Sequence, residues 1–143
     1  MRTAAIGIVL LLGLTGSSFL HGQVQDEAAV RRTLDHYLAG HATGDGSHMR
    51  LAFHPEARLF WVQDGALRQR TSAEYIAGFT GRPAPDEAQR NRRIESVDIS
   101  GTAASARIVL DYPAVRFVDY MSLLKVDGEW KIVNKIFHRE PRS

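Results

Sequence analysis

The sequence predicts a single α+β domain in which helices cover one face of a curved antiparallel sheet. Apolar residues recur at helical spacing in the first third of the chain, and a period of two takes over from Arg92 onward. Two Asp-Gly pairs, Asp64-Gly65 and Asp127-Gly128, each separate two runs of strand composition. Helices that precede a strand meander form one layer on the sheet. We expect such a sheet to close on its three helices like a cone and to leave an apolar cavity.

Residues 1–22 have the pattern of a secretory signal peptide. A positive Arg2 precedes an uninterrupted apolar or glycine run, Ala4–Leu14, which small polar residues follow. We therefore predict removal of residues 1–22, with cleavage after Ser18 or Gly22, and a mature domain of residues 23–143 that is secreted or periplasmic. The alternative is an uncleaved anchor.

The apolar run is shorter than the roughly 20 residues that a spanning helix needs. We therefore expect no stable membrane span after cleavage of the signal segment.

Composition restricts the classes of partner. The 143 residues suit one domain with its own core, and the absence of cysteine excludes disulfides and thiolate metal sites. Lys and Arg total 18 against 16 Asp and Glu, a net charge of +2. This near balance argues against nucleic acid or an anionic membrane as partner.

Three helices are predicted before the main strands. The first runs from Asp26, as its N-cap, to about Gly40. A short second helix covers 47–53 and ends before Pro55. The third covers 72–79 behind a capping box formed by Thr71 and Glu74. The apolar stripe of the first helix comprises Val30, Leu34, Tyr37, Leu38 and His41.

Four strands lead into a long hairpin at the end of the chain. The predicted strands are 57–62, 66–70, 94–100 and 103–112. A two-residue turn at Asp127-Gly128 then pairs residues whose numbers sum to 255. Because side chains alternate across a strand, one face should carry Phe117, Asp119, Met121, Leu123, Lys125, Trp130, Ile132, Asn134, Ile136 and His138.

We interpret that mostly apolar face as core or pocket. The opposite face carries Tyr120 and Lys135, and we expect it to be half-exposed or to pack against another subunit. A slip of one residue would exchange the two faces.

Several segments resemble the nuclear transport factor 2-like superfamily, and its "putative lumazine-binding" branch in particular. The resemblance rests on the order of elements, on Thr43-Gly-Asp45, on Phe53-His-Pro55 and on 119–138, which includes Asp-Gly-Glu-Trp-Lys-Ile-Val. It covers about 26–140. It implies a cone-shaped, cystatin-like α+β fold, a pocket between helices and sheet, and homodimers through the sheet. It implies no reaction, because fold does not fix function.

Asp119 and His138 are the candidate catalytic pair. The predicted register makes them diagonal neighbours on one face, about 7–8 Å apart between backbones. A carboxylate orients an imidazole and raises its pKa, which suits acid–base chemistry. The competing interpretation is a half-buried ion pair that closes the end of the cone.

Five further residues are candidate ligand contacts. Asn134 offers an amide on the pocket wall, or is a satisfied core amide. The others are His54, which alternatively caps a helix end, and the aromatic residues Tyr37, Trp61 and Tyr75, which alternatively belong to the core.

No metal or cofactor is predicted. The sequence has no zincin histidine pair, phosphate loop, nucleophile elbow or dinucleotide motif. A spatial site from His41, His54 and His138 is the minority metal hypothesis. We predict that the arginine cluster at 82–93 is a solvent-exposed edge of the protein. The alternative is that it binds an anionic substrate.

The sequence thus predicts an exported small-molecule-binding protein of unspecified ligand. The alternative is a cofactor-independent lyase or isomerase that uses Asp119 and His138 as acid and base. An interaction module that dimerises through the Tyr120/Lys135 face is the third possibility.

Overall fold

The structure, a computed structural model, describes residues 16–142, and most of the predicted signal segment lies outside them. The α+β class is confirmed. The elements are α1 (Gly16–Thr43), α2 (Gly46–Ala52), β1 (Phe53–Gln63), β2 (Ala66–Thr71), α3 (Ser72–Ile76), the 3₁₀ helix η1 (Glu87–Gln89), β3 (Asn91–Ser100), β4 (Ala103–Asp111), β5 (Val115–Val126) and β6 (Glu129–Pro141).

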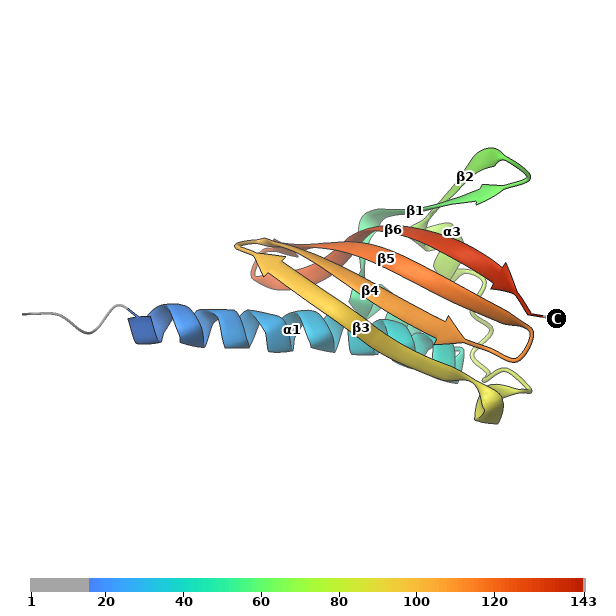
Figure 1. Cartoon of the computed structure of the whole chain (residues 1–143), viewed down its shortest axis with the longest axis horizontal. Coiled ribbons are helices and arrows are strands. Elements are labelled where there is room, and N and C mark those ends of the chain that lie inside the picture. Colours follow the sequence, from blue (N-terminus) through green and yellow to red (C-terminus); the bar gives the residue numbers. More distant parts are fainter. Residues whose placement is uncertain (1–15, 143) are drawn as a thin grey trace, which may run out of the picture.

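Six strands form one curved sheet in the order β2-β1-β6-β5-β4-β3. All neighbouring pairs are antiparallel except β1 and β6, which run parallel. Figure 1 shows α1 along one face of the sheet, with its N-terminal part projecting beyond the strands. We call the helix-covered face the inner face and the opposite one the outer face.

Helix α1 begins at Gly16, ten residues before the predicted start at Asp26. Asp26 is therefore not its N-cap. Its Oδ1 instead accepts hydrogen bonds from Lys125 Nζ at 2.7 Å and Trp130 Nε1 at 3.1 Å, which dock α1 on the end of the long hairpin. Among residues 16–142, no helix combines the length and hydropathy required to span a bilayer.

The predicted caps around α2 and α3 are present. Asp45 accepts the Ser47 amide at the start of α2, and Thr71 and Glu74 form the capping box of α3. Gly44 turns the chain between α1 and α2 with φ of +69°. A Cβ there would overlap the Arg82 carbonyl, so this close approach of two loops requires glycine.

The core fills the space between the helices and the inner face. It contains three of the five predicted stripe residues of α1, one residue of α2 and alternate residues of the strands: Val30, Leu34, Tyr37, Met49, Ala57, Leu59, Ala106, Ile108, Leu110, Met121, Leu123, Trp130 and Ile132. Leu38 of the predicted stripe is only partly buried against this core. Two polar side chains, Asp119 and Lys135, are buried in the same layer at 0% and 4% exposure.

The long hairpin turns where predicted. Asp127 and Gly128 have φ of 50° and 82°, the conformation that a type I′ turn requires. Val126 pairs with Glu129, and the predicted sum of 255 holds as far as Leu123 with Ile132.

Beyond that pair, a bulge at Val133 makes the predicted register wrong. Ser122 pairs with Asn134, and the shift of one residue continues along β6 to the end of the sheet. The pairing of β1 with β6 is also irregular at this level. Because alternation is strict, the shift brings Lys135 and Phe137 to the inner face and moves Asn134, Ile136 and His138 to the outer face.

Candidate functional site

A cavity of about 150 Å³ lies on the inner face, where the far half of the hairpin meets the helices. We call it the inner pocket. Two α-helices and five strands contribute its walls: His41, Leu59, Arg70, Tyr75, Leu110, Phe117, Lys135 and Phe137. Half of these side chains are apolar and half carry a polar or charged group. This combination is typical of small-molecule sites.

A buried triad of Tyr37, Asp119 and Lys135 lies behind the pocket wall. Lys135 Nζ is 3.0 Å from Asp119 Oδ1 and donates to Tyr37 Oη at 2.6 Å. The Tyr37 hydroxyl in turn donates to Asp119 Oδ2 at 2.6 Å. The three groups come from α1, β5 and β6, so their meeting depends on helix docking as well as on strand register.

One carboxylate oxygen of the triad accepts no hydrogen bond. Asp119 Oδ1 is buried and has no well-directed hydrogen bond, although the Lys135 ammonium lies beside it. Buried polar atoms are normally hydrogen-bonded, and exceptions often mark functional sites. This oxygen is therefore available to accept a proton from the neighbouring amine.

Burial is the largest influence on the pKa values of Lys135 and Tyr37. It lowers the pKa of Lys135 below its ordinary value, and the Asp119 charge only partly opposes this effect. Burial, followed by the Asp119 charge, raises the pKa of Tyr37 well above its ordinary value. Tyr37 is thus a permanent hydrogen-bond donor at neutral pH, and Lys135 gives up its proton more readily than a surface lysine.

His41 and Tyr75 form a second polar pair at the pocket wall. His41 Nε2 and Tyr75 Oη are 2.8 Å apart. Burial lowers the pKa of His41 well below its ordinary value, and the positive charges of Lys135, Arg92 and Arg90 lower it further. Burial raises the pKa of Tyr75. Both groups are therefore neutral near pH 7, and either can donate or accept one hydrogen bond.

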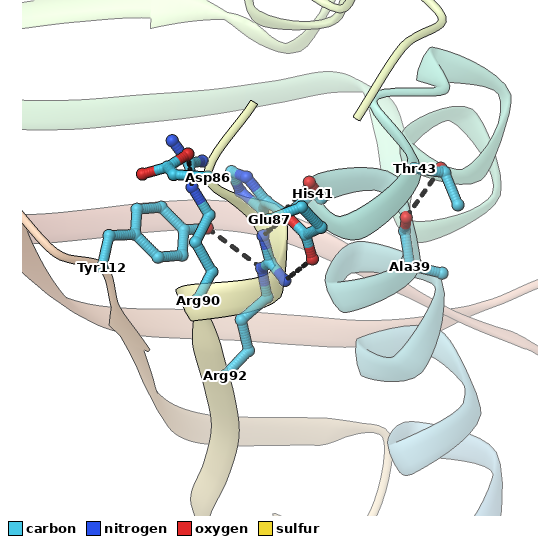
Figure 2. A network of polar contacts seen from close by, with 8 residues as sticks. All are labelled: Ala39, His41, Thr43, Asp86, Glu87, Arg90, Arg92 and Tyr112. Atoms are coloured by element: carbon cyan, nitrogen blue, oxygen red, sulfur yellow. Dashed lines mark hydrogen bonds and ion pairs between the residues drawn. The ribbon is translucent and has the colours of Figure 1, made fainter. Parts of the chain in front are cut away.

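A polar network connects the segment 86–92 with Tyr112 and with His41 near the end of α1, as Figure 2 shows. The Arg92 guanidinium donates to both carboxylate oxygens of Glu87, at 2.5 and 2.7 Å, to Tyr112 Oη and to the His41 carbonyl. Arg90 lies 4.2 Å over the Tyr112 ring. The network fixes the end of α1, and with it the His41 side chain, against β3 and β4.

The predicted catalytic pair does not form. Asp119 is fully buried on the inner face, as predicted for a core or pocket position. His138 pairs with Val118 on the outer face and is exposed, because the bulge at Val133 reversed its side. The hypothesis of an Asp119/His138 acid–base pair is therefore wrong in its geometry.

The predicted ligand contacts are scattered over the molecule. Tyr75 lines the inner pocket, Tyr37 lies behind it, and Trp61 stacks on the pocket residue Phe137 with ring centroids 5.5 Å apart. Asn134 faces a shallow groove on the outer face, because the bulge moved it there. His54 lines a separate cavity.

That second cavity is larger, about 740 Å³, and lies between α2 and α3. Its walls include Arg50, His54 and Phe79. His54 Nδ1 accepts the Glu56 amide there at 3.2 Å.

Three residues that line the inner pocket were not predicted to do so from the sequence. Lys135 was placed on the half-exposed face, and His41 was assigned to a helical stripe and, as a minority hypothesis, to a metal site rather than to the ligand pocket. Arg70 drew no attention, because an arginine on an edge strand is common. The available signal for Lys135 was a lysine in the middle of a long strand, followed by Ile136 and Phe137, but the alternation rule assigned it to the wrong side.

No metal centre is formed by the part of the chain that the structure describes: it holds no group of three or more His, Cys, Asp or Glu side chains suited to a metal ion. His41 and His138, two members of the hypothetical histidine site, lie on opposite faces of the sheet.

Fold and site together define a protein of the nuclear transport factor 2-like class. A solved NTF2-like protein from Shewanella baltica is 36% identical, with a TM-score of 0.75 over 83% of this chain and 97% of that one. Another, from Methylobacillus flagellatus, is 32% identical, with a TM-score of 0.69 over 82% and 94% of the two chains.

The chain belongs to the family described as "Putative lumazine-binding", whose model matches residues 25–138. A curated relative, aldolase FrzH from a Cladobotryum species, is 22% identical over 114 residues, which are 80% of this chain and 91% of that protein. The expected superfamily and branch are thus confirmed.

Proposed function

We propose that this protein binds one compact small molecule, about the size of a single six-membered ring, in the inner pocket. The observation that carries the proposal is the pocket itself: a partly open volume of about 150 Å³ with four apolar and four polar or charged side chains in its walls. An apolar cavity of about this volume, engineered in another protein, holds benzene. The membership in a family named for ligand binding supports the same function.

The charges of the pocket favour an anionic or strongly hydrogen-bond-accepting group on the ligand. Arg70 forms no ion pair within residues 16–142 and lies 5.0 Å over the Trp61 ring. Asp119 compensates the Lys135 charge, and neutral His41 contributes none. Arg70 is therefore the cation at the wall without an ion-pair partner among the described residues, although its charge also acts on Glu74, and a carboxylate is the group that a guanidinium binds best.

Benzoate tests this function, because it combines one ring with one carboxylate. We expect benzoate to raise the melting temperature of the purified protein, with an increase that grows with the logarithm of its concentration above Kd, since a ligand stabilises the state that binds it. Arg70→Gln should weaken binding roughly tenfold, the loss of one charge-assisted contact of about 1.5 kcal/mol. Arg68→Gln, on the same strand outside the pocket walls, is the matched control. Equal binding by both variants, or none by the parent protein, contradicts the proposal.

A cofactor-independent lyase or isomerase is the second candidate. The aldolase relative favours it, as does a wall that holds an amine, an imidazole and a phenol close to a buried carboxylate. His138 has no place in this version, since it is exposed. Carbonyl release from a panel of β-hydroxy carbonyl compounds, followed by NMR, is the measurement. Turnover that survives in Lys135→Met and in His41→Gln would place the reaction elsewhere.

We further propose a homodimer through the outer face of the sheet. Tyr120, Leu124 and Ile136 expose large apolar surfaces there, at 48%, 41% and 51%. Exposed apolar clusters on a sheet mark interaction sites. Sedimentation should give a dimer, and Ile136→Lys should give a monomer. Val62→Lys, on the distant β1–β2 hairpin, should leave the dimer intact. A parent protein that sediments as a monomer at high concentration would exclude this assembly.

We also propose export with removal of the N-terminal segment, on the signal pattern of residues 1–22. The intact mass of the protein recovered from outside the cytoplasm is the measurement. A chain that keeps its first 22 residues and sediments with membranes would support the anchor instead.

A further inference from the structure

We propose that Lys135 is a nucleophilic amine that captures the carbonyl group of a ligand as an imine. The inference rests on the proposed function, because it makes the inner pocket a site for small aldehydes or ketones. Its evidence is separate: the position of the amine, the oxygen beside it and the distribution of lysines in the chain.

The Lys135 amine lies between the pocket and the buried pair behind it. On the pocket side, Nζ is 5.5 Å from the centre of the Tyr75 ring and 4.8 Å from that of Phe137, and both rings line the cavity. On the other side it contacts Tyr37 and Asp119, which do not line the cavity. A carbonyl carbon at the inner end of the pocket would therefore meet this nitrogen.

A lysine must lose a proton before it attacks, and the site provides the acceptor. Asp119 Oδ1, 3.0 Å from Nζ, has no directed hydrogen bond of its own. Burial and the positive charge of Arg70 both favour the neutral amine. Lysines desolvated in apolar pockets or placed near another cation are the ones that form Schiff bases.

The chemistry balances within the site. The ammonium gives one proton to Asp119, and its lone pair forms the N–C bond while the C=O π electrons move to oxygen. That oxygen takes a proton from Asp119 to give a carbinolamine. The carbinolamine nitrogen, still positively charged, gives a second proton to Asp119, which passes it to the hydroxyl group, and the freed nitrogen lone pair then expels water. The iminium N–H that results gives its proton to Asp119, which leaves the neutral imine, one water molecule and a protonated carboxyl group. Tyr37, which holds Oδ2 of the same carboxylate, positions Asp119 for these transfers.

The chain contains only three lysines, which makes the proposal sharply testable. Lys125 pairs with Asp26, and Lys131 pairs with Glu129 and donates to the Leu51 carbonyl. Neither lines the inner pocket. They are therefore internal controls for the reactivity of a lysine outside the pocket.

Benzaldehyde with sodium cyanoborohydride at pH 7 is the experiment, since reduction makes each imine a permanent benzyl group. Peptide mass mapping should find the label on Lys135 before it appears on Lys125 or Lys131, because burial lowers the pKa of Lys135 and the neutral amine is the form that attacks. Benzoate should compete with this labelling. Equal labelling of the three lysines, or labelling of the surface lysines alone, overturns the proposal.

Variants separate this inference from simple binding. Lys135→Met should abolish pocket labelling, whereas Lys131→Met should leave it unchanged. Asp119→Asn should slow it, because an amide does not accept the proton. Tyr37→Phe, which keeps the carboxylate, should slow it less and provides a second variant if Asp119→Asn does not fold. Benzoate binding without Lys135 labelling would refute the imine while the binding function stands. Failure of both would refute the pocket as a ligand site.

Discussion

The two halves of the β5–β6 hairpin differ in their pairing register. Near the turn, from Val126 with Glu129 to Leu123 with Ile132, pairing follows from the Asp-Gly turn alone. Beyond the bulge at Val133 the partners shift by one, and this far half carries Asp119, Lys135 and Phe137 of the candidate site. In the half near the turn, the pairing register is thus set by the turn itself. In the far half, the register is not the one that the turn predicts, and β6 is also paired with β1 there.

The difference shows that a single extra residue can decide which side chains face a pocket. Without the bulge, Asn134 and His138 would point inward and Lys135 outward. The bulge lies where the parallel pairing of β1 with β6 is also irregular, so both neighbours of β6 accommodate it together. Bulges are common next to functional sites, because they redirect a side chain without changing the sheet.

The two halves of the hairpin should differ most in how far a substitution lowers the stability of the protein. Asp119→Ala leaves the Lys135 ammonium buried without its carboxylate, and we expect it to lower the free energy of unfolding by about 3–5 kcal/mol. Glu129→Ala removes the exposed partner of Lys131 near the turn and should leave it unchanged within error. Urea denaturation measures both.

A double variant tests the origin of that loss. Asp119→Leu with Lys135→Met replaces the buried pair by apolar groups, and it should recover most of the lost stability. A double variant as unstable as the sum of the two single ones would show that the pair is not coupled.

His41 should make stability depend on pH. Its pKa is lowered in the folded state from an ordinary value of 6.5, so the unfolded chain binds more protons below about pH 6.5. Stability contributed by the neutral imidazole is therefore present above that pH and lost as the pH falls, with a limiting slope of about 1.4 kcal/mol per pH unit.

Urea midpoints between pH 7.5 and 5.5 measure this slope, a range that lies above the ordinary carboxylate pKa values. His41→Gln, which keeps a hydrogen-bond partner for Tyr75, should reduce the slope by that amount. An unchanged slope in this variant would assign the pH dependence to other histidines.

A local effect, without consequence for the pocket, is expected at the turn. Gly128→Ala places a Cβ on a residue with φ of 82°, where the added atom meets no neighbour within 4 Å. The cost is then backbone strain alone, about 1–2 kcal/mol. Ligand binding should not change, because the far half takes its register from β1 and the helices. Loss of benzoate binding in this variant would show that the two halves are coupled.

The sequence by itself determined the elements and their order. Helical spacing located the buried side of α1, the Thr71/Glu74 box located α3, and the Asp-Gly pairs located both hairpins. It also indicated an inner position for Asp119, since β5 keeps its alternation. These features depend on interactions between residues a few positions apart, so the local order of residue types is enough to predict them.

Only the tertiary structure decided which groups meet Asp119. The bulge at Val133 has no local signature, because Val133 suits a regular strand equally well. It occurs where the pairing of β6 with β1 is also irregular, which is a feature of the assembled sheet. Tyr37 is 82 residues away from Asp119 in the chain, and His41 meets Tyr75 across 34 residues. Such contacts form when whole elements dock on one another. The spacing of residues along one strand does not predict how the elements dock.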